Sequence, residues 1–159
     1  MTVLFQRHFQ VAYVVDDIHT AMAELSQNMG VSRWDVVDMA TPEGPGQVLK
    51  FNANAWSGDV MIELIQPDPA ATSIYSGWRL DSDSNLRLHH LGYLVDSAEQ
   101  MAEHRQHLIR NGHSIVAEGS FGNVLDFAYA DTTALLGHYY EIIWLKEQGN
   151  DFFNRIPVN

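Results

Sequence analysis

The sequence predicts an α+β fold of two tandem βαβββ modules, because one pattern of strands and a helix occurs twice along the chain. The stretch FQVAYVVDD at 9–17 is nearly repeated as HHLGYLVDS at 89–97. MIELI at 61–65 has a counterpart in YYEII at 139–143, so two strands agree in the same order. The predicted boundaries are 1–66 for the first module, 67–87 for a connecting segment, 88–145 for the second module and 146–159 for a C-terminal tail.

Hydrophobic periodicity defines the elements of the first module. Residues 9–15 are apolar on one parity and largely apolar on the other, which is typical of a strand buried on both faces. Asp17 is a suitable N-cap for a helix with apolar residues at helical spacing, and Gly30 is placed to end it. Further strands are predicted around 34–37, 48–52 and 59–66, with a turn at TPEGPGQ, 41–47.

The second module repeats this order. A strand over 88–95 precedes a helix that begins at Ser97, with Gln100 three residues on as in a capping box, and ends near Gly112. Strands follow around 114–118, 124–130 and 138–145. The polar, aperiodic segment 67–87 connects the modules, and the tail, with its two phenylalanines, is expected to dock on the rest of the chain.

Composition limits the class of protein. The 159 residues are 46% hydrophobic, which is enough for a sizeable core. The net charge of -11 argues against nucleic acid and anionic membranes as partners, and the absence of cysteine removes disulfides and thiol nucleophiles. There is no signal-peptide core and no apolar run near the roughly 20 residues that span a bilayer. We therefore expect a cytoplasmic globular protein.

Four polar side chains share one predicted face of otherwise apolar strands, and these are Gln10, Glu63, His90 and Glu141. The opposite face of each strand is strongly apolar and should pack on the helices, so the polar face should line a concave space. A carboxylate there is costly unless it is paired or binds a metal. These nitrogen and oxygen donors suit Zn, Ni, Co, Mn or Fe(II) without distinguishing them. A purely structural role for the four residues is the alternative.

The remaining histidines are expected to lie elsewhere. His89 and His138 have the opposite parity to their neighbours, which predicts positions near the sheet surface or the rim of the site. His104 and His107 form an i, i+3 pair, which predicts a solvated helix face.

The quoted stretches, with GHYYEIIWL at 137–145, resemble the vicinal oxygen chelate superfamily of glyoxalases, methylmalonyl-CoA epimerases, extradiol dioxygenases and bleomycin-resistance proteins. The resemblance covers about residues 9–145. It implies paired half-barrel sheets with helices outside, one divalent metal ion between first and last strands, and a homodimer. Carried over by position, the metal ligands are Gln10, Glu63, His90 and Glu141.

This ligand pattern is most similar to that of lactoylglutathione lyase. It implies a metal-dependent lyase or isomerase that removes a proton alpha to a carbonyl on a small substrate with vicinal oxygens. Glu141 would be the principal base and Glu63 its partner. Methylmalonyl-CoA epimerases usually have His at the first metal-ligand position and Gln at the second. Extradiol dioxygenases use two His and one Glu as ligands. Gln10, at the first position here, departs from both patterns.

The main alternative is a non-catalytic, drug-type binding protein of the same fold. Its cavity would hold a small aromatic molecule, and aromatic residues that could line it are Trp34, Trp56, Trp78 and Tyr139. A methylmalonyl-CoA epimerase and an Fe(II) dioxygenase are less favoured. The sequence identifies neither the metal nor the substrate.

Overall fold

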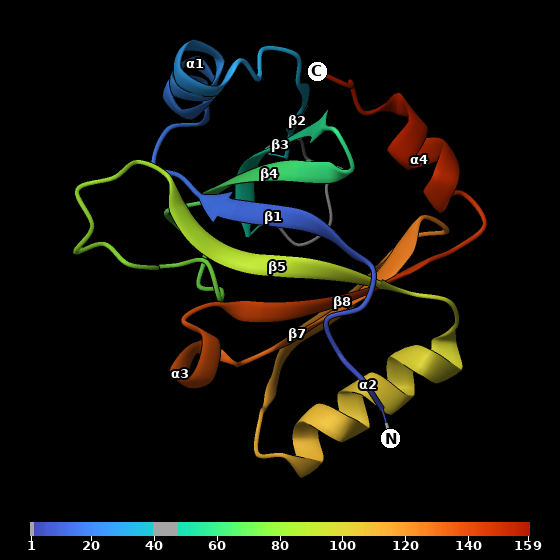
Figure 1. The fold of residues 1–159 in the computed structure, drawn as a ribbon. Coiled ribbons are helices and arrows are strands. Elements are labelled where there is room, and N and C mark those ends of the chain that lie inside the picture. Colours follow the sequence, from blue (N-terminus) through green and yellow to red (C-terminus); the bar gives the residue numbers. More distant parts are fainter. Residues whose placement is uncertain (1, 40–47) are drawn as a thin grey trace. The chain divides into compact units, whose positions relative to one another are not determined.

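A computed structural model describes residues 2–39 and 48–159, so the turn predicted at 41–47 lies outside the described residues. Eight strands and four helices lie within these ranges (Figure 1). In chain order they are β1 (His8–Val14), α1 (Ile18–Met29), β2 (Asp35–Asp38), β3 (Leu49–Ser57), β4 (Val60–Pro67), β5 (Arg87–Val95), α2 (Ala98–Arg110), β6 (Ile115–Phe121), β7 (Leu125–Ala130), α3 (Thr133–Leu136), β8 (Tyr139–Leu145) and α4 (Gly149–Arg155). The predicted α+β class and tandem βαβββ order are confirmed, with α3 and α4 as additions.

The chain folds into two compact units. Unit 1 contains the chain up to Gln10 together with His90–Arg155, and unit 2 contains Val11–His89 together with Ile156–Asn159. Strands β1 and β5 therefore each contribute residues to both units. The units are defined by contacts and the modules by sequence repetition, so the module boundaries stay a prediction.

Unit 2 holds the strands in the order β2-β3-β4-β1, and α1 covers one face of them (Figure 1). The buried residues between helix and strands are Val15, Ile18, Ala21, Ala53 and Leu64. Asp17 caps the helix by accepting a 2.7 Å hydrogen bond from the Thr20 backbone N–H. Gly30 ends it with a φ of 76°, a left-handed conformation that glycine adopts without a Cβ penalty.

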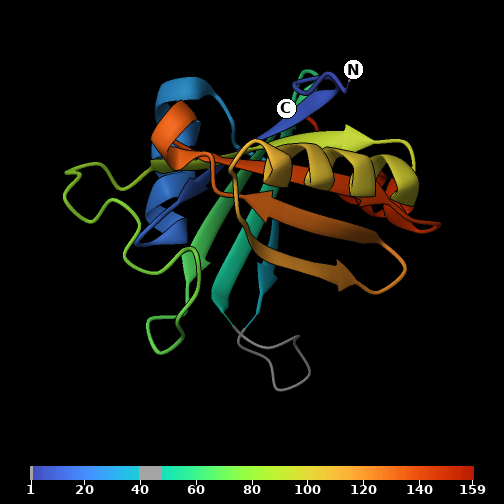
Figure 2. The same cartoon turned by 90° about the horizontal axis from the view of Figure 1, so that it is seen from below.

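Unit 1 holds the strands in the order β5-β8-β7-β6, with β5 and β8 parallel and the other pairs antiparallel. Helix α2 lies along β8 and β7 (Figure 2). Ser97 caps the helix by accepting a hydrogen bond from the Gln100 N–H at 3.2 Å. Large side chains of the predicted apolar face fill the space below α2, among them Tyr93, Val95, Tyr140 and Ile142.

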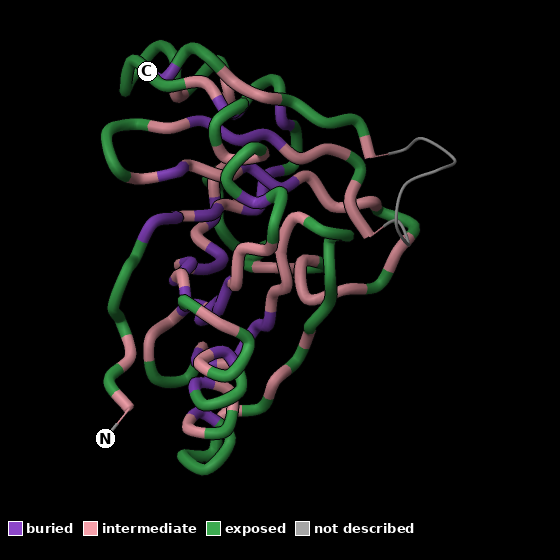
Figure 3. The backbone as a smooth tube through the Cα atoms, turned by 90° about the vertical axis from the view of Figure 1, so that its right-hand side faces the viewer, coloured by how far each residue is buried: buried purple, intermediate pink, exposed green. Residues whose placement is uncertain are grey.

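The C-terminal tail docks as expected, and it does so in two places. Within unit 1, α4 carries Phe153, whose ring centroid lies 5.4 Å from that of Phe9. Within unit 2, Val158 pairs with Trp56 in an isolated parallel bridge. Buried residues follow the strands, whereas the connecting segment 67–87 is mostly exposed or half-buried (Figure 3). Among the described residues no helix is both long and apolar enough to cross a membrane.

Candidate functional site

Two of the predicted ligands meet at the centre of unit 1. In the parallel pairing of β5 and β8, Gly92 stands opposite Glu141, which brings Glu141 beside the neighbouring His90. His90 Nε2 lies 3.1 Å from Glu141 Oε2, and the two side chains are 0% and 6% exposed. Their strands turn the alternate residues, such as Tyr140 and Ile142, toward the core that α2 covers. The pair therefore lies on the opposite face of the sheet from α2, as strand parity predicts.

Gln10 belongs to the same unit and reaches the same strand. A Cβ at residue 92 would lie 2.6 Å from Gln10 Oε1 and 3.0 Å from Gln10 Cβ. Only a glycine therefore leaves room for the Gln10 amide at this point of β5. Because Gly92 stands opposite Glu141, the Gln10 amide oxygen is held against β5, the strand that carries His90.

The three side chains fit a divalent metal ion by donor type and spacing. Gln10 Oε1, His90 Nε2 and Glu141 Oε2 are all buried from solvent. Two ligands that are each about 2.1 Å from one ion lie roughly 3.0–3.4 Å apart, which includes the measured separation of His90 and Glu141. Within residues 2–39 and 48–159, no group of three or more His, Cys, Asp or Glu is placed to hold a metal. His90 and Glu141 are two side chains of these types, and the third donor atom in unit 1 is the amide oxygen of Gln10.

Two tyrosines lie beside the contact between His90 and Glu141. Tyr129 on β7 stands opposite Glu141, and its ring meets that of His90 edge to face at a centroid distance of 5.0 Å. Tyr139 stands opposite His90 on β8. Burial, with a smaller contribution from the Asp131 charge, raises the pKa of Tyr139. The Tyr139 phenol therefore stays protonated at neutral pH and can donate a hydrogen bond.

The fourth predicted ligand, Glu63, belongs to unit 2. It is half-buried on β4, where its register partner on β3 is Asn54. Asn52 donates from Nδ2 to Glu63 Oε1 at 2.8 Å, and Asn54 donates to Asn52 Oδ1 at 2.6 Å. This chain of amides fixes the orientation of the Glu63 carboxylate. Its role as a ligand stays a prediction from the sequence duplication.

Two expectations about other histidines are wrong. His89 is fully buried, not near the surface, because the connecting segment folds over it. Its ring lies 4.8 Å from that of Tyr75 and 4.9 Å from that of Trp78, and its Nε2 donates to the Ile74 carbonyl. His104 is 6% exposed, so it lies on the packed face of α2 and not on the solvated one.

Sequence reasoning missed Gly92, Asn52, Asn54 and Tyr129. A glycine inside a strand can indicate a close approach of another group, which would have singled out Gly92. The alternation in FNANAW, 51–56, places two asparagines on one strand face, which was a usable signal. Tyr129 gave no signal, because its place beside His90 depends on the register of β7 and β8.

The sequence matches the family described as the glyoxalase/bleomycin resistance protein/dioxygenase superfamily over residues 9–129. None of the curated proteins matches it significantly. Among solved structures, a hypothetical protein from Bacillus halodurans is similar with a TM-score of 0.65 and 18% identity, covering 89% of this chain and 96% of that one.

Methylmalonyl-CoA epimerases are also similar in structure. The enzyme from Mycobacterium tuberculosis has a TM-score of 0.65 and 17% identity, with 95% of each chain covered. A variant of the Streptomyces coelicolor enzyme, in complex with 2-nitronate-propionyl-CoA, has a TM-score of 0.62 and 11% identity, covering 87% of this chain and 94% of that one. At these identities the similarity shows the fold alone.

Proposed function

Because the chain belongs to the glyoxalase/bleomycin resistance protein/dioxygenase superfamily, we propose that it is a metal-dependent lyase or isomerase. It would remove a proton from the carbon alpha to a carbonyl on a small substrate with vicinal oxygens. Proton removal of this kind needs a base beside the acidic carbon and a positive charge beside the developing oxyanion.

The contact between His90 and Glu141 carries the proposal. Burying a carboxylate and an imidazole is costly, and a strand interior that only needed packing would hold apolar residues here. A divalent ion held by Gln10, His90 and Glu141 would use all three buried donor atoms. Glu63 is proposed as the fourth ligand from its place in the duplicated sequence.

The protein's own residues have distinct roles in this proposal. When bound, the ion would supply Lewis-acid polarisation of a substrate oxygen. Glu141 is the principal base and would take the proton at Oε1, since its Oε2, 3.1 Å from His90 Nε2, would hold the ion together with that imidazole. Glu63 is its partner, with the Asn52 amide keeping its Oε1 oriented. The rings of Tyr129 and His90 exclude water from the Glu141 side.

The substrate class is open between three chemistries. Acyl-CoA thioesters are included because methylmalonyl-CoA epimerases share the fold. Hemithioacetals are included because of the glyoxalase-like ligand pattern, and small diols because the chain has only 9 Lys and Arg to bind a highly charged conjugate.

A second candidate function is a non-catalytic binding protein of the same fold. One observation favours it: His90 and Glu141 already contact each other directly, which would satisfy both groups without a metal. The two functions are separated by metal content and by turnover.

The experiment measures the metal content of protein purified without chelator or immobilised nickel, together with turnover of a hemithioacetal, an acyl-CoA and a diol. We expect about one equivalent of a divalent metal, which Glu141→Gln lowers while abolishing turnover and leaving the circular dichroism spectrum unchanged. His90→Ala should also lose the metal. His104→Ala is the matched control, because it removes another buried imidazole from the same unit without touching the site.

Full turnover in Glu141→Gln would contradict the assignment of the base. Absence of metal in the wild-type protein, even after incubation with Zn, Ni, Co and Mn, would favour the binding protein instead. An equal loss of metal in His104→Ala would mean that the effect is structural.

A further inference from the structure

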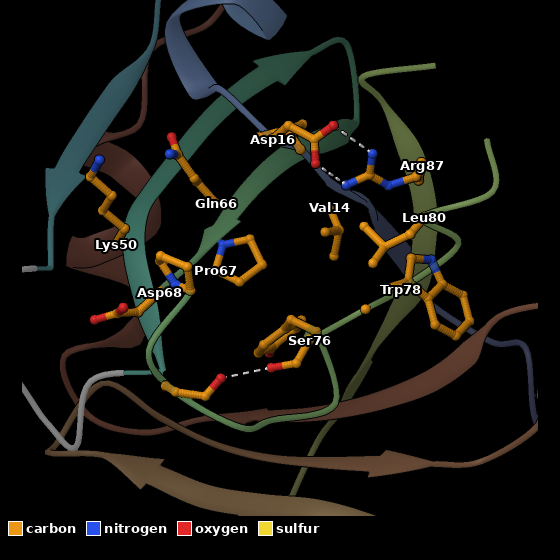
Figure 4. A pocket seen from close by; sticks show the side chains of 15 residues that line it. Val14, Asp16, Lys50, Gln66, Pro67, Asp68, Ser76, Trp78, Leu80 and Arg87 are labelled. Carbon is orange, nitrogen blue, oxygen red and sulfur yellow. Dashed lines mark hydrogen bonds and ion pairs between the residues drawn. The ribbon is translucent and has the colours of Figure 1, made fainter. Parts of the chain in front are cut away.

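Unit 2 contains a pocket of about 300 Å³ that takes no part in the proposed reaction. Its walls come from the end of β1, the start of β3, the end of β4 and the connecting segment (Figure 4). The lining residues on which recognition depends are Lys50, Gln66, Pro67, Asp68, Ala71 and Leu80. All of them belong to unit 2, so the pocket exists independently of the candidate site in unit 1.

An irregularity of β3 brings Lys50 to this pocket. The register of β3 on β4 shifts by one residue between Leu49 and Phe51, which makes Lys50 the extra residue of a β-bulge. The bulge interrupts the alternation of the strand, because Leu49 packs on the buried cluster that contains Val14, whereas Phe51 packs on the α1 side. Bulges re-aim side chains in this way and are frequent beside binding sites.

Lys50 and Asp68 are opposite charges that form no ion pair within the described residues. Figure 4 shows both on the same side of the pocket, with Gln66 above them. Asp68 Oδ1 accepts a hydrogen bond from the Ala70 N–H at 2.8 Å, which leaves Oδ2 for a ligand. Gln66 Oε1 accepts from the Ile18 N–H at 3.0 Å, which leaves the Gln66 amide N–H groups as further donors in the wall.

The other two charges of the wall already match each other. Arg87 donates from Nη1 and Nη2 to the two carboxylate oxygens of Asp16 at 2.9 and 2.6 Å. This pair adds no net charge, so the field inside the pocket depends on Lys50 and Asp68. A simple anion would be attracted by one of them and repelled by the other, and so would a simple cation. A ligand that carries one charge of each sign can be attracted by both.

The rest of the wall suits an aliphatic group. Pro67, Ala71 and Leu80 line the pocket, and Leu80 is 70% exposed, so it lies at the rim. Apolar surface of this kind gains free energy when an aliphatic side chain covers it. A volume of about 300 Å³ is at the small end for ligand pockets, which fits a small metabolite.

We propose that this pocket binds a free α-amino acid with an aliphatic side chain. The carboxylate would contact Lys50 and the Gln66 amide, and the ammonium group would contact Asp68 Oδ2. The aliphatic side chain would cover Pro67 and Leu80. This binding does not depend on a metal or on turnover in unit 1.

The test titrates L-leucine into isotope-labelled protein and follows the backbone amide signals of Lys50 and Asp68 by two-dimensional NMR. Two analogues of the same carbon skeleton each lack one charge, since isocaproate has no ammonium group and isoamylamine has no carboxylate. We expect a saturable shift with L-leucine. Both analogues should bind by about fivefold or more weakly, because each loses the attraction of one charge and keeps the repulsion of the other.

Two substitutions assign the charges. In Lys50→Met, L-leucine should bind about fivefold more weakly and isoamylamine should bind at least as well as L-leucine, because the repelling cation is gone. Asp68→Asn keeps the acceptor for the Ala70 N–H and should give isocaproate the same advantage. Asp59→Asn is the matched control, because it removes an exposed carboxylate from the turn between β3 and β4, outside the pocket, and should leave all three affinities unchanged.

The proposal would be overturned by no saturable shift with L-leucine, or by tighter binding of either analogue to the wild type. An unchanged order of the three ligands in Lys50→Met and Asp68→Asn, or an equal loss of binding in Asp59→Asn, would also overturn it. Glu141→Gln should bind L-leucine as the wild type does, which separates this result from the outcome for the proposed enzyme.

Discussion

Gly92→Ala is expected to destabilise unit 1 by displacing the Gln10 amide. The added Cβ would lie 2.6 Å from Gln10 Oε1, 3.0 Å from Gln10 Cβ and 3.2 Å from Phe9 Cε1, where ordinary contacts are 3.4–4 Å. The amide oxygen can rotate away, but the other two atoms belong to strand β1 and can move less. Overpacking of this kind costs about 1–3 kcal/mol. For a chain of this size, each kcal/mol lowers Tm by about 2–4 °C.

The assay is urea unfolding of the wild type, Gly92→Ala, Gln10→Ala and the double variant. Gln10→Ala removes the 2.6 Å clash but keeps the 3.0 Å contact of its Cβ, so about half of the cost should disappear in the double variant. The coupling free energy should therefore be about 0.5–1.5 kcal/mol. A cost of Gly92→Ala below about 0.5 kcal/mol, or an equal cost in both backgrounds, would refute the close approach of Gln10 to β5.

Two further predictions concern pH. The hydrogen bonds from Arg87 hold the pKa of Asp16 below its usual value, so their stabilisation is present above the unfolded pKa of about 3.9 and is lost as pH falls through the folded pKa. Asp16→Asn should lower the free energy of unfolding by about 1–2 kcal/mol at pH 7. This is less than the loss of a fully buried ion pair would cost, because Asp16 is 65% exposed. In urea unfolding, the difference in free energy between the variant and the wild type should shrink below about pH 4. Burial strongly raises the pKa of the Tyr140 phenol, so the folded protein keeps this proton to higher pH than the unfolded chain does. The stability that depends on the neutral phenol is complete below the unfolded pKa of about 10 and is lost as pH rises toward the folded pKa. Absorbance at 295 nm should show Tyr140 ionising only together with unfolding, and a normal titration of all six tyrosines in the folded protein would contradict this.

The sequence by itself determined the duplication, the order of the elements and the face of each strand that carries the polar residues. These features depend on local periodicity, since side chains alternate along a strand and recur every 3.6 residues along a helix. Asp17 and Gly30 mark the ends of α1, and Ser97 marks the start of α2, because capping is also a local property. The parity of Glu141 within an apolar strand was sufficient to select it as a candidate.

Only the tertiary structure decided which candidates meet. The contact of His90 with Glu141 depends on the parallel register of β5 and β8, and the space for Gln10 depends on the missing Cβ of Gly92. His89 was misplaced by sequence reasoning because residues of the connecting segment cover it. Each of these facts joins residues that are far apart in the chain. Periodicity records which way a side chain points, but strand register and long-range packing determine what it touches.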